Sequence, residues 1–236
     1  SLGSLIIFPV IAILVWLPQL RNHTAPAKDC SELDGHSYLW RNIDAWSITL
    51  FLALNSFLMY IFISWLPTIL VELGYNHHQA GVIHGVLQLF TAVPAILLIP
   101  LMAKITDKRL LSFSLTIMAF LGILGLIYAP SYAMVWGMFF GFGAGGGFIV
   151  ALALISLRTQ TAHQAATLSG MAQFLGYLLA ATGPIIMGAI HEHCGSWQQP
   201  LALCAVVALV WSIFAVLASK SQLISSNSAA LSPQTI

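Results

Sequence analysis

Long uncharged segments separate short clusters of charged residues along this chain. No Asp, Glu, Lys or Arg occurs in residues 45–71, 73–103, 110–157, 159–191 and 193–219. A helix of about 20 apolar residues can cross the hydrocarbon core of a bilayer. Four of these segments therefore predict one membrane span each. The longest, 110–157, predicts two spans separated by the turn signal Ala129-Pro130-Ser131.

The segment before Pro18 is also apolar, but it is shorter than a complete span. It lacks the basic start and the small-residue cleavage site of a signal peptide, so we interpret it as the end of a helix. We therefore expect an all-α membrane protein with six complete transmembrane helices and the end of a seventh. The predicted spans are residues 1–17, 46–71, 79–102, 111–128, 132–156, 166–190 and 199–219.

The composition agrees with a membrane location. Hydrophobic residues make up 59% of the chain and charged residues only 6%, whereas a soluble domain is about 25% charged. The eight Lys and Arg nearly cancel the seven acidic residues. Such a chain has no strongly basic face for phosphates, which excludes a nucleic-acid partner and leaves the lipid bilayer as its surroundings.

The basic residues predict how the chain lies in the membrane. If residues 18–45 are cytoplasmic, the alternation of spans places every Lys and Arg on that side, as the positive-inside rule expects. Residues 18–45 then form a cytoplasmic inter-domain loop, residues 46–219 a six-helix bundle, and the Ser-rich residues 220–236 a disordered cytoplasmic tail. The basic residues are Arg21, Lys28, Arg41, Lys104, Lys108, Arg109, Arg158 and Lys220.

The cysteines and histidines predict neither a disulfide nor a metal site. Cys30 is placed in the cytoplasm, Cys194 outside and Cys204 within the last span, so they lie too far apart to pair. His-Glu-His-Cys at 191–194 and the pair at 77–78 lack helical ligand spacing and a second ligand cluster. We interpret these histidines as exposed loop residues and expect no metal and no cofactor.

Several segments resemble a known transporter family. Ala-Lys-Ile-Thr-Asp-Lys-Arg at 103–109 resembles the signature loop of the major facilitator superfamily, with Asp107 and Lys108 at its acidic and basic positions. Segments 64–70, 87–98 and 155–184 are similar to the cyanate porter family of that superfamily. The resemblance implies the C-terminal half of a twelve-helix secondary transporter of the bacterial inner membrane, monomeric at full length and working by alternating access.

The resemblance also implies a small solute, either a cyanate-like anion or a 2-nitroimidazole-like compound. Polar side chains near the bilayer midplane are costly unless they face a cavity or a partner. At 1.5 Å per residue, five of them come near mid-depth, and His84 lies one turn from one of these. The predicted solute-binding residues are Asn55, Tyr60, His84, Gln88, Gln173 and Tyr177.

Other interpretations of these residues stay open. A lone amide in a membrane often only bonds a neighbouring helix, and Trp65 and Phe148 either line the path or pack. No acidic residue lies within a complete span, so a proton, if one is coupled, requires His84 or the missing half. Arg158 ends a span, and we expect it to reach lipid phosphate. The alternatives for Arg158 are a gate contact, together with the loop of Asp107 and Lys108, or capture of an anionic solute.

Residues 141–148, Gly-Phe-Gly-Ala-Gly-Gly-Gly-Phe, match a dinucleotide-binding pattern at Gly141, Gly143 and Gly146. The pattern requires a preceding strand and a later acidic residue, and residues 110–191 contain no acidic residue. Small residues instead recur every four positions, which allows close helix approach in lipid. We predict a close-packed helix that also hinges, with Gly137, Gly141 and Gly145 on one face and Gly143 and Gly147 on another.

The function classes left to compare are an enzyme, a receptor or assembly subunit, a channel and a carrier. No metalloprotease or nucleophile-elbow motif occurs, so we do not expect an enzyme. A receptor or assembly subunit would carry a soluble domain or a long tail. A channel is distinguished from a carrier only by saturable uptake and counterflow. Facilitated diffusion, or export of another small organic anion, remains the alternative to coupled uptake.

Overall fold

The structure, a computed structural model, describes residues 6–17, 39–220 and 224. The chain divides into two compact units, Ser1–Asp34 and Gly35–Ile236. In the first unit, helix α1 (Ile7–Trp16) is apolar throughout. It falls within the segment where the end of a helix was predicted.

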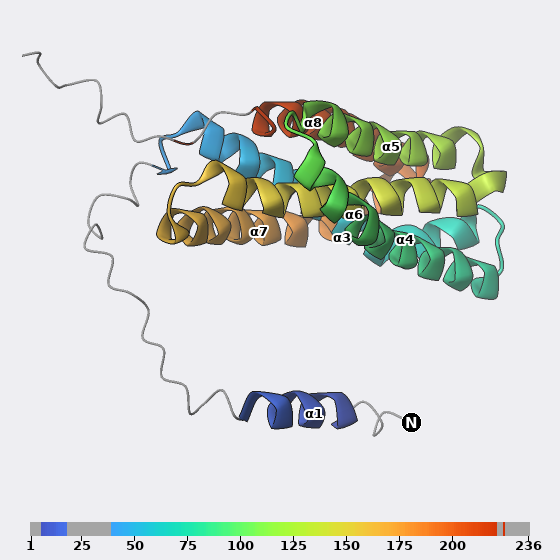
Figure 1. Cartoon of the computed structure of the whole chain (residues 1–236). Helices are drawn as coiled ribbons and strands as arrows, with labels where there is room; N and C mark the ends of the chain where they lie inside the picture. Colours follow the sequence, from blue (N-terminus) through green and yellow to red (C-terminus); the bar gives the residue numbers. More distant parts are fainter. Residues whose placement is uncertain (1–5, 18–38, 221–223, 225–236) are drawn as a thin grey trace, which may run out of the picture. The chain divides into compact units, whose positions relative to one another are not determined.

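The described part of the second unit is a bundle of six helices that are long and apolar enough to cross a membrane (Figure 1). This confirms the expected all-α membrane architecture. The predicted spans agree with the observed helices to within four residues at each end. The helices are α3 (Ile43–Glu72), α4 (His77–Lys104), α5 (Arg109–Tyr128), α6 (Ala133–Arg158), α7 (Ala162–Cys194) and α8 (Gln198–Ala218), with the 3₁₀ helix η3 (Pro130–Tyr132) before α6.

The start of α3 lies inside the segment that was predicted to be a loop. The Asn42 side chain accepts hydrogen bonds from the N–H groups of Asp44 and Ala45 at 2.8 and 3.2 Å. This cap satisfies two of the backbone donors that a helix start leaves unpaired. The helix therefore begins at Ile43 rather than at residue 46.

The ends of α7 also differ from the prediction. Thr161 caps its start, because the Thr161 side chain accepts from the N–H of Gln164. Gly195 ends it in the left-handed conformation, at φ 68°, which glycine adopts without steric cost. Residues 191–194 therefore form the last turn of α7, and His77 and His78 form the first turn of α4. The prediction that these histidines lie in loops is wrong.

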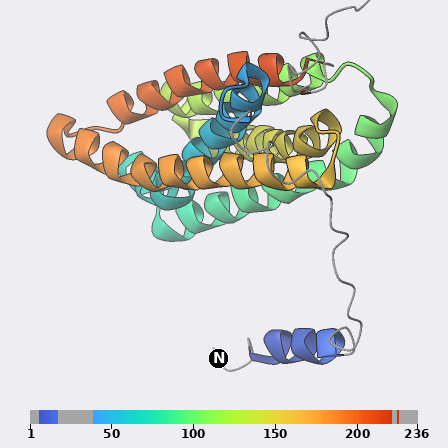
Figure 2. The ribbon, with the colours of Figure 1, turned by 90° about the vertical axis from the view of Figure 1, so that its left-hand side faces the viewer.

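Helix α3 lies at the centre of the bundle. It packs against α4, α6, α7 and α8, while α6 packs against α4 and α5, and α5 against α8. Figure 2 shows α3, in blue, passing between α7 and α8. In the most apolar stretch of α3, 67% of the residues are buried, against only 22% in α7 and 24% in α4. Helices α4 and α7 therefore form the least covered flanks of the bundle.

The glycines of α6 lie where neighbouring backbones come closest. A Cβ at Gly141 or Gly145 would collide with the carbonyl oxygen of Leu87 or Thr91 of α4, and one at Gly143 would collide with Leu115 of α5. The two predicted faces therefore meet two different helices. Gly147 departs from this scheme, since its neighbour is the Trp211 ring of α8.

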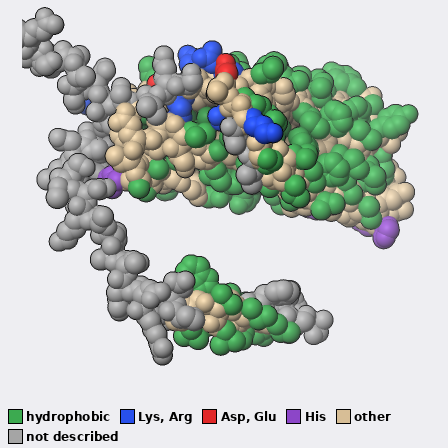
Figure 3. Space-filling view, in the orientation of Figure 1, with side chains coloured by type: hydrophobic (Ala, Val, Ile, Leu, Met, Phe, Trp, Pro, Cys, Tyr) green, Lys and Arg blue, Asp and Glu red, His purple; other side chains and the backbone are tan. Residues whose placement is uncertain are grey.

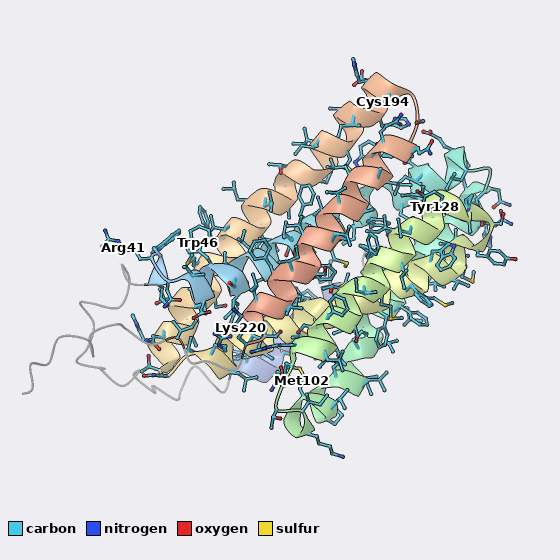
Figure 4. The ribbon with its side chains drawn as sticks, turned by 90° about the horizontal axis from the view of Figure 1, so that it is seen from above. Arg41, Trp46, Met102, Tyr128, Cys194 and Lys220 are labelled. Atoms are coloured by element: carbon cyan, nitrogen blue, oxygen red, sulfur yellow. The ribbon has the colours of Figure 1, made fainter. Side chains whose placement is uncertain are left out.

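The alternation of the helices separates two chemically different ends. The starts of α3, α5 and α7 and the ends of α4, α6 and α8 lie together, and Figure 4 shows Arg41, Met102 and Lys220 toward this end and Tyr128 and Cys194 toward the other. In Figure 3 the Lys and Arg side chains, in blue, gather in one part of the bundle. We call this the basic end. Of the Lys and Arg that the structure describes, all lie there: Arg41, Lys104, Lys108, Arg109, Arg158 and Lys220.

Candidate functional site

A cavity of about 300 Å³ opens between α3, α4, α6 and α7. Its wall is largely apolar, with a few polar groups, as in small-molecule sites generally. Five of the residues singled out from the sequence line it: Asn55, Tyr60, Gly145, Phe148 and Tyr177. Ser56 and Thr91 also line it, and neither was predicted.

Two tyrosines form one side of the cavity. The rings of Tyr60 in α3 and Tyr177 in α7 meet edge to face, with centroids 6.2 Å apart and planes at 77°. Tyr60 is 44% exposed and Tyr177 47% exposed, so both rings also face open space. Aromatic edges and faces of this kind favour contact with another flat ring, and each hydroxyl can donate or accept a hydrogen bond.

Asn55 is completely buried in the cavity wall. Its Nδ2 donates to the carbonyl oxygen of Ala144 in α6 at 3.2 Å. The carbonyl can only accept, so this bond fixes which way the amide points. Its Oδ1 has no hydrogen-bond partner in the described part of the chain. Asn55 thus bonds a neighbouring helix, as the alternative interpretation of a lone amide expected.

The other predicted solute-binding residues do not line this cavity. His84 and Gln88 are half-buried on α4, on the face that the sequence suggested, but outside the lining. The Nε2 of Gln173 donates to Ser169 Oγ within its own helix at 2.7 Å. Thr91, three residues after Gln88, takes the place expected of Gln88, and its hydroxyl donates to the Gln88 carbonyl at 2.7 Å.

Trp65 lies away from the cavity and joins two helices. Its indole N–H donates to the carbonyl of Pro184 in α7 at 2.9 Å. Gly188, one turn further along α7, leaves room for the ring, since a Cβ there would come within 2.9 Å of it. Of the two interpretations of Trp65, the structure therefore supports packing.

Arg158 does not reach lipid, and that expectation is wrong. Its side chain is enclosed by protein, and the residue is 3% exposed. One guanidinium nitrogen donates to the carbonyls of Ala218 and Lys220 at the end of α8, and the other lies 3.6 Å from Asp44 Oδ1 at the start of α3. Arg158 thus joins the ends of three helices. Sequence alone gave no signal for these contacts, because the partners are far apart in the chain.

The tail also makes contact at one described position. Ile224 is buried, and its N–H donates to the carbonyl of Arg158 at 2.9 Å. At this residue the chain differs from the disordered tail that was predicted, whereas residues 221–223 and 225–236 lie outside the described part. In the loop before α5, Asp107 Oδ1 lies 3.8 Å from Nε of Arg109, the first residue of α5, and the Lys108 ammonium donates to the Ile105 carbonyl. These contacts therefore stay within the loop and the start of α5.

The opposite end of the bundle carries four of the described histidines, His77, His78, His191 and His193. His191 Nε2 lies 3.0 Å from Glu72 Oε2, so this residue joins α7 to α3. No group of three potential metal ligands occurs among the described residues. Cys194 is exposed and Cys204 buried, and both are free thiols, while Cys30 lies outside the described residues.

Comparison with known proteins gives the family. The sequence profile described as Major Facilitator Superfamily matches residues 2–181 and also residues 48–232. The chain is 42% identical to the 2-nitroimidazole transporter of Escherichia coli over 222 residues, which are 94% of this chain and 56% of that protein. It is 37% identical to the uncharacterized transporter YycB of Bacillus subtilis over 85% of this chain and 50% of that protein.

A more distant relative is the cyanate transport protein CynX of Escherichia coli, 27% identical over 70% of this chain and 44% of that protein. The chain therefore spans about half the length of the relatives that it matches. These findings agree with the transporter interpretation and not with an enzyme. This multi-pass membrane chain belongs to the major facilitator superfamily.

Proposed function

We propose that this chain is the C-terminal half of a secondary transporter that moves a small solute across the bacterial inner membrane by alternating access. The observation that carries the proposal is the cavity between α3, α4, α6 and α7, which lies between the two least covered helices. Membership of the family and the names of the relatives support it. The N-terminal half would complete the cavity wall.

The solute that fits the cavity best is a flat heteroaromatic compound like 2-nitroimidazole. Tyr60 and Tyr177 offer ring edges and hydroxyls, and Phe148 adds a third aromatic ring to the lining. Stacking and edge contacts with such rings contribute about 0.5–1.5 kcal/mol each. A small anion such as cyanate is the second candidate, and the two tyrosine hydroxyls support it as hydrogen-bond donors.

The proposal includes an orientation. The basic end faces the cytoplasm, because Lys and Arg are retained on that side of bacterial membranes. The C-terminus then lies in the cytoplasm as well. The full-length protein is a monomer, and its glycine-rich α6 slides or bends during the cycle, since its close approach to α4 and α5 depends on the absence of side chains.

Counterflow tests the proposal directly. The full-length protein is reconstituted into liposomes loaded with unlabelled 2-nitroimidazole or cyanate, and entry of the labelled compound is followed. A carrier gives saturable entry that is accelerated by the internal solute, whereas a channel gives non-saturable flux without acceleration. Saturable counterflow of either compound supports the proposal, and its absence for both overturns the substrate assignment.

Tyr177→Ala connects that activity to the cavity. Losing one aromatic contact raises the half-saturating concentration about fivefold, which corresponds to about 1 kcal/mol. Tyr128→Ala is the matched control, because Tyr128 is 80% exposed at the end of α5 and does not line the cavity. An equal effect of the two substitutions would remove the cavity from the proposal.

A further inference from the structure

The end of the bundle opposite the basic end contains an ionisable pair that joins two helices. His191, in the last turn of α7, places Nε2 3.0 Å from Oε2 of Glu72, the last residue of α3. The side chains are 25% and 44% exposed, so protons from the aqueous phase reach both. A neutral imidazole makes one ordinary hydrogen bond here, whereas a protonated one makes a charge-assisted bond.

An aromatic ring also contacts His191. The His191 ring stacks on Trp197, with centroids 4.1 Å apart and planes at 21°. A cation at this distance from the face of an indole is attracted by its negative π surface. Trp197 is buried, and its ring centroid lies 5.2 Å from that of Trp65, so Trp197 is held in place under the imidazole. The Glu72 carboxylate and the Trp197 indole face thus both present negative charge density to the His191 ring.

Among the described residues, the elements packed against α7 bring no charge other than Glu72 near His191. The helices that pack against α7 are α3, α6 and α8. Helix α3 contributes Glu72, the first turn of α8 contains only uncharged side chains, and the Arg158 of α6 lies at the basic end. On α7 itself, Glu192 and His193 point into solvent. His77 and His78, at the start of α4, are also exposed and at this same end.

The pair lies on the same two helices that form one side of the cavity. Between Tyr60–Tyr177 and Glu72–His191, the two helices are joined once more, by the bond from Trp65 to the Pro184 carbonyl. Both helices also contain a proline in this region, Pro67 in α3 and Pro184 in α7. Prolines inside a helix remove a backbone hydrogen bond and permit bending.

We propose that His191 and Glu72 form a proton-binding site, and that the bound proton ties the ends of α3 and α7 together beyond the cavity. The proton goes onto the imidazole, which becomes a cation paired with the Glu72 carboxylate and stacked on Trp197. The ion pair between His191 and Glu72 is fully formed below the pH range in which histidine titrates, and it weakens as pH rises through that range. Its effect on transport rests on the function proposed above, whereas proton binding does not.

Fluorescence tests proton binding without any solute. The full-length protein is titrated from about pH 5 to pH 8 while tryptophan emission is followed, because an imidazolium quenches a stacked indole more strongly than a neutral imidazole does. We expect a transition in the wild type and in His193→Gln, the matched control in the same turn, and none in His191→Gln. Glu72→Gln keeps the stacked ring and shifts the midpoint down by about half a pH unit. The same titration in the wild type and His191→Gln would overturn the site.

Transport provides the second test. Entry of labelled 2-nitroimidazole into proteoliposomes is measured while pH is varied on the side of His191 alone. We expect the rate to change about threefold over the histidine range, the ratio that corresponds to an ion pair of ordinary surface strength. The change is retained in His193→Gln and lost in His191→Gln. An unchanged dependence in His191→Gln overturns the coupling to transport. No entry in any variant, with the fluorescence transition intact, refutes the proposed solute and leaves the proton site standing.

Discussion

A single methyl group at Gly145 should separate two helices. In Gly145→Ala the new Cβ would lie 2.6 Å from the Cα of Thr91 and 2.7 Å from its carbonyl carbon. Carbon atoms in contact are normally about 3.5–4.0 Å apart, so α4 and α6 must move apart by about 1 Å. The obstacle is backbone, which cannot rotate away as a flexible side chain can.

The size of the effect follows from two opposing contributions. Overpacking of this kind costs about 1–3 kcal/mol, and replacing glycine by alanine inside a helix returns about 0.5–1 kcal/mol. Gly137→Ala is the matched control on the same helix and facing the same neighbour, because its Cβ would lie 3.6 Å from the nearest atom, in Ile83. This control receives the gain without the collision. The two variants should therefore differ in stability by about 1–3 kcal/mol.

Thermal unfolding of the full-length protein in detergent measures this difference. A change of 1 kcal/mol moves the midpoint by about 1–2 °C for a protein about twice as long as this chain. Gly145→Ala should therefore unfold about 1–6 °C below Gly137→Ala. If the two midpoints coincide, the close approach of α6 to α4 does not depend on Gly145, and the packing argument for the glycine-rich segment is refuted.

The remaining predictions concern buried polar groups. Arg158→Met leaves the Ala218 and Lys220 carbonyls without their donor and should lower stability by about 1–3 kcal/mol. Asp44→Asn should cost less, because Asp44 is partly exposed and its Oδ1 lies 3.6 Å from the guanidinium. An equal loss for the two variants in thermal unfolding would assign the stabilising role of Arg158 to the ion pair. Asn55→Asp places a carboxylate against the Ala144 carbonyl and should destabilise the protein far more than Asn55→Leu, which is similar in size. Equal thermal unfolding midpoints for these two variants would contradict the buried bond from Asn55 to Ala144.

The helices could be predicted from the sequence because charge marks most of their ends. Charged residues such as Glu72 and Arg158 bound the spans, except between α5 and α6, where the turn signal at residues 129–131 marks the boundary. The span count therefore did not depend on any tertiary contact. The exact first and last residues of the helices depended instead on capping hydrogen bonds and backbone conformation. The Asn42 cap and the left-handed Gly195 moved the ends of α3 and α7 into segments that had been read as loops.

The cavity could be predicted only in part. Depth in the membrane can be counted along a helix, and this placed Asn55, Tyr60 and Tyr177 at the correct level. Which way a side chain points requires a hydrophobic face, and these helices are apolar on all sides. Gln88 and Gln173 therefore met the depth criterion and still fell outside the lining, while Thr91 was missed. The buried contacts of Arg158 depend on tertiary structure alone.

The polar bonds of α3 divide this helix into two parts with different partners. Toward the basic end and at mid-depth it is bonded to α6 and α8, through groups that are largely buried. In its other half it is bonded to α7, through groups that reach solvent at the end. Breaking the first set leaves buried partners unsatisfied, whereas the second set can exchange with water at lower cost. The polar bonds from α3 to α7 are therefore easier to exchange with water than those from α3 to α6 and α8, and the Glu72–His191 pair lies at the solvent-exposed end of this second set. The first set comprises Asp44–Arg158, Asn55–Ala144 and Phe51–Trp211, and the second Trp65–Pro184 and Glu72–His191.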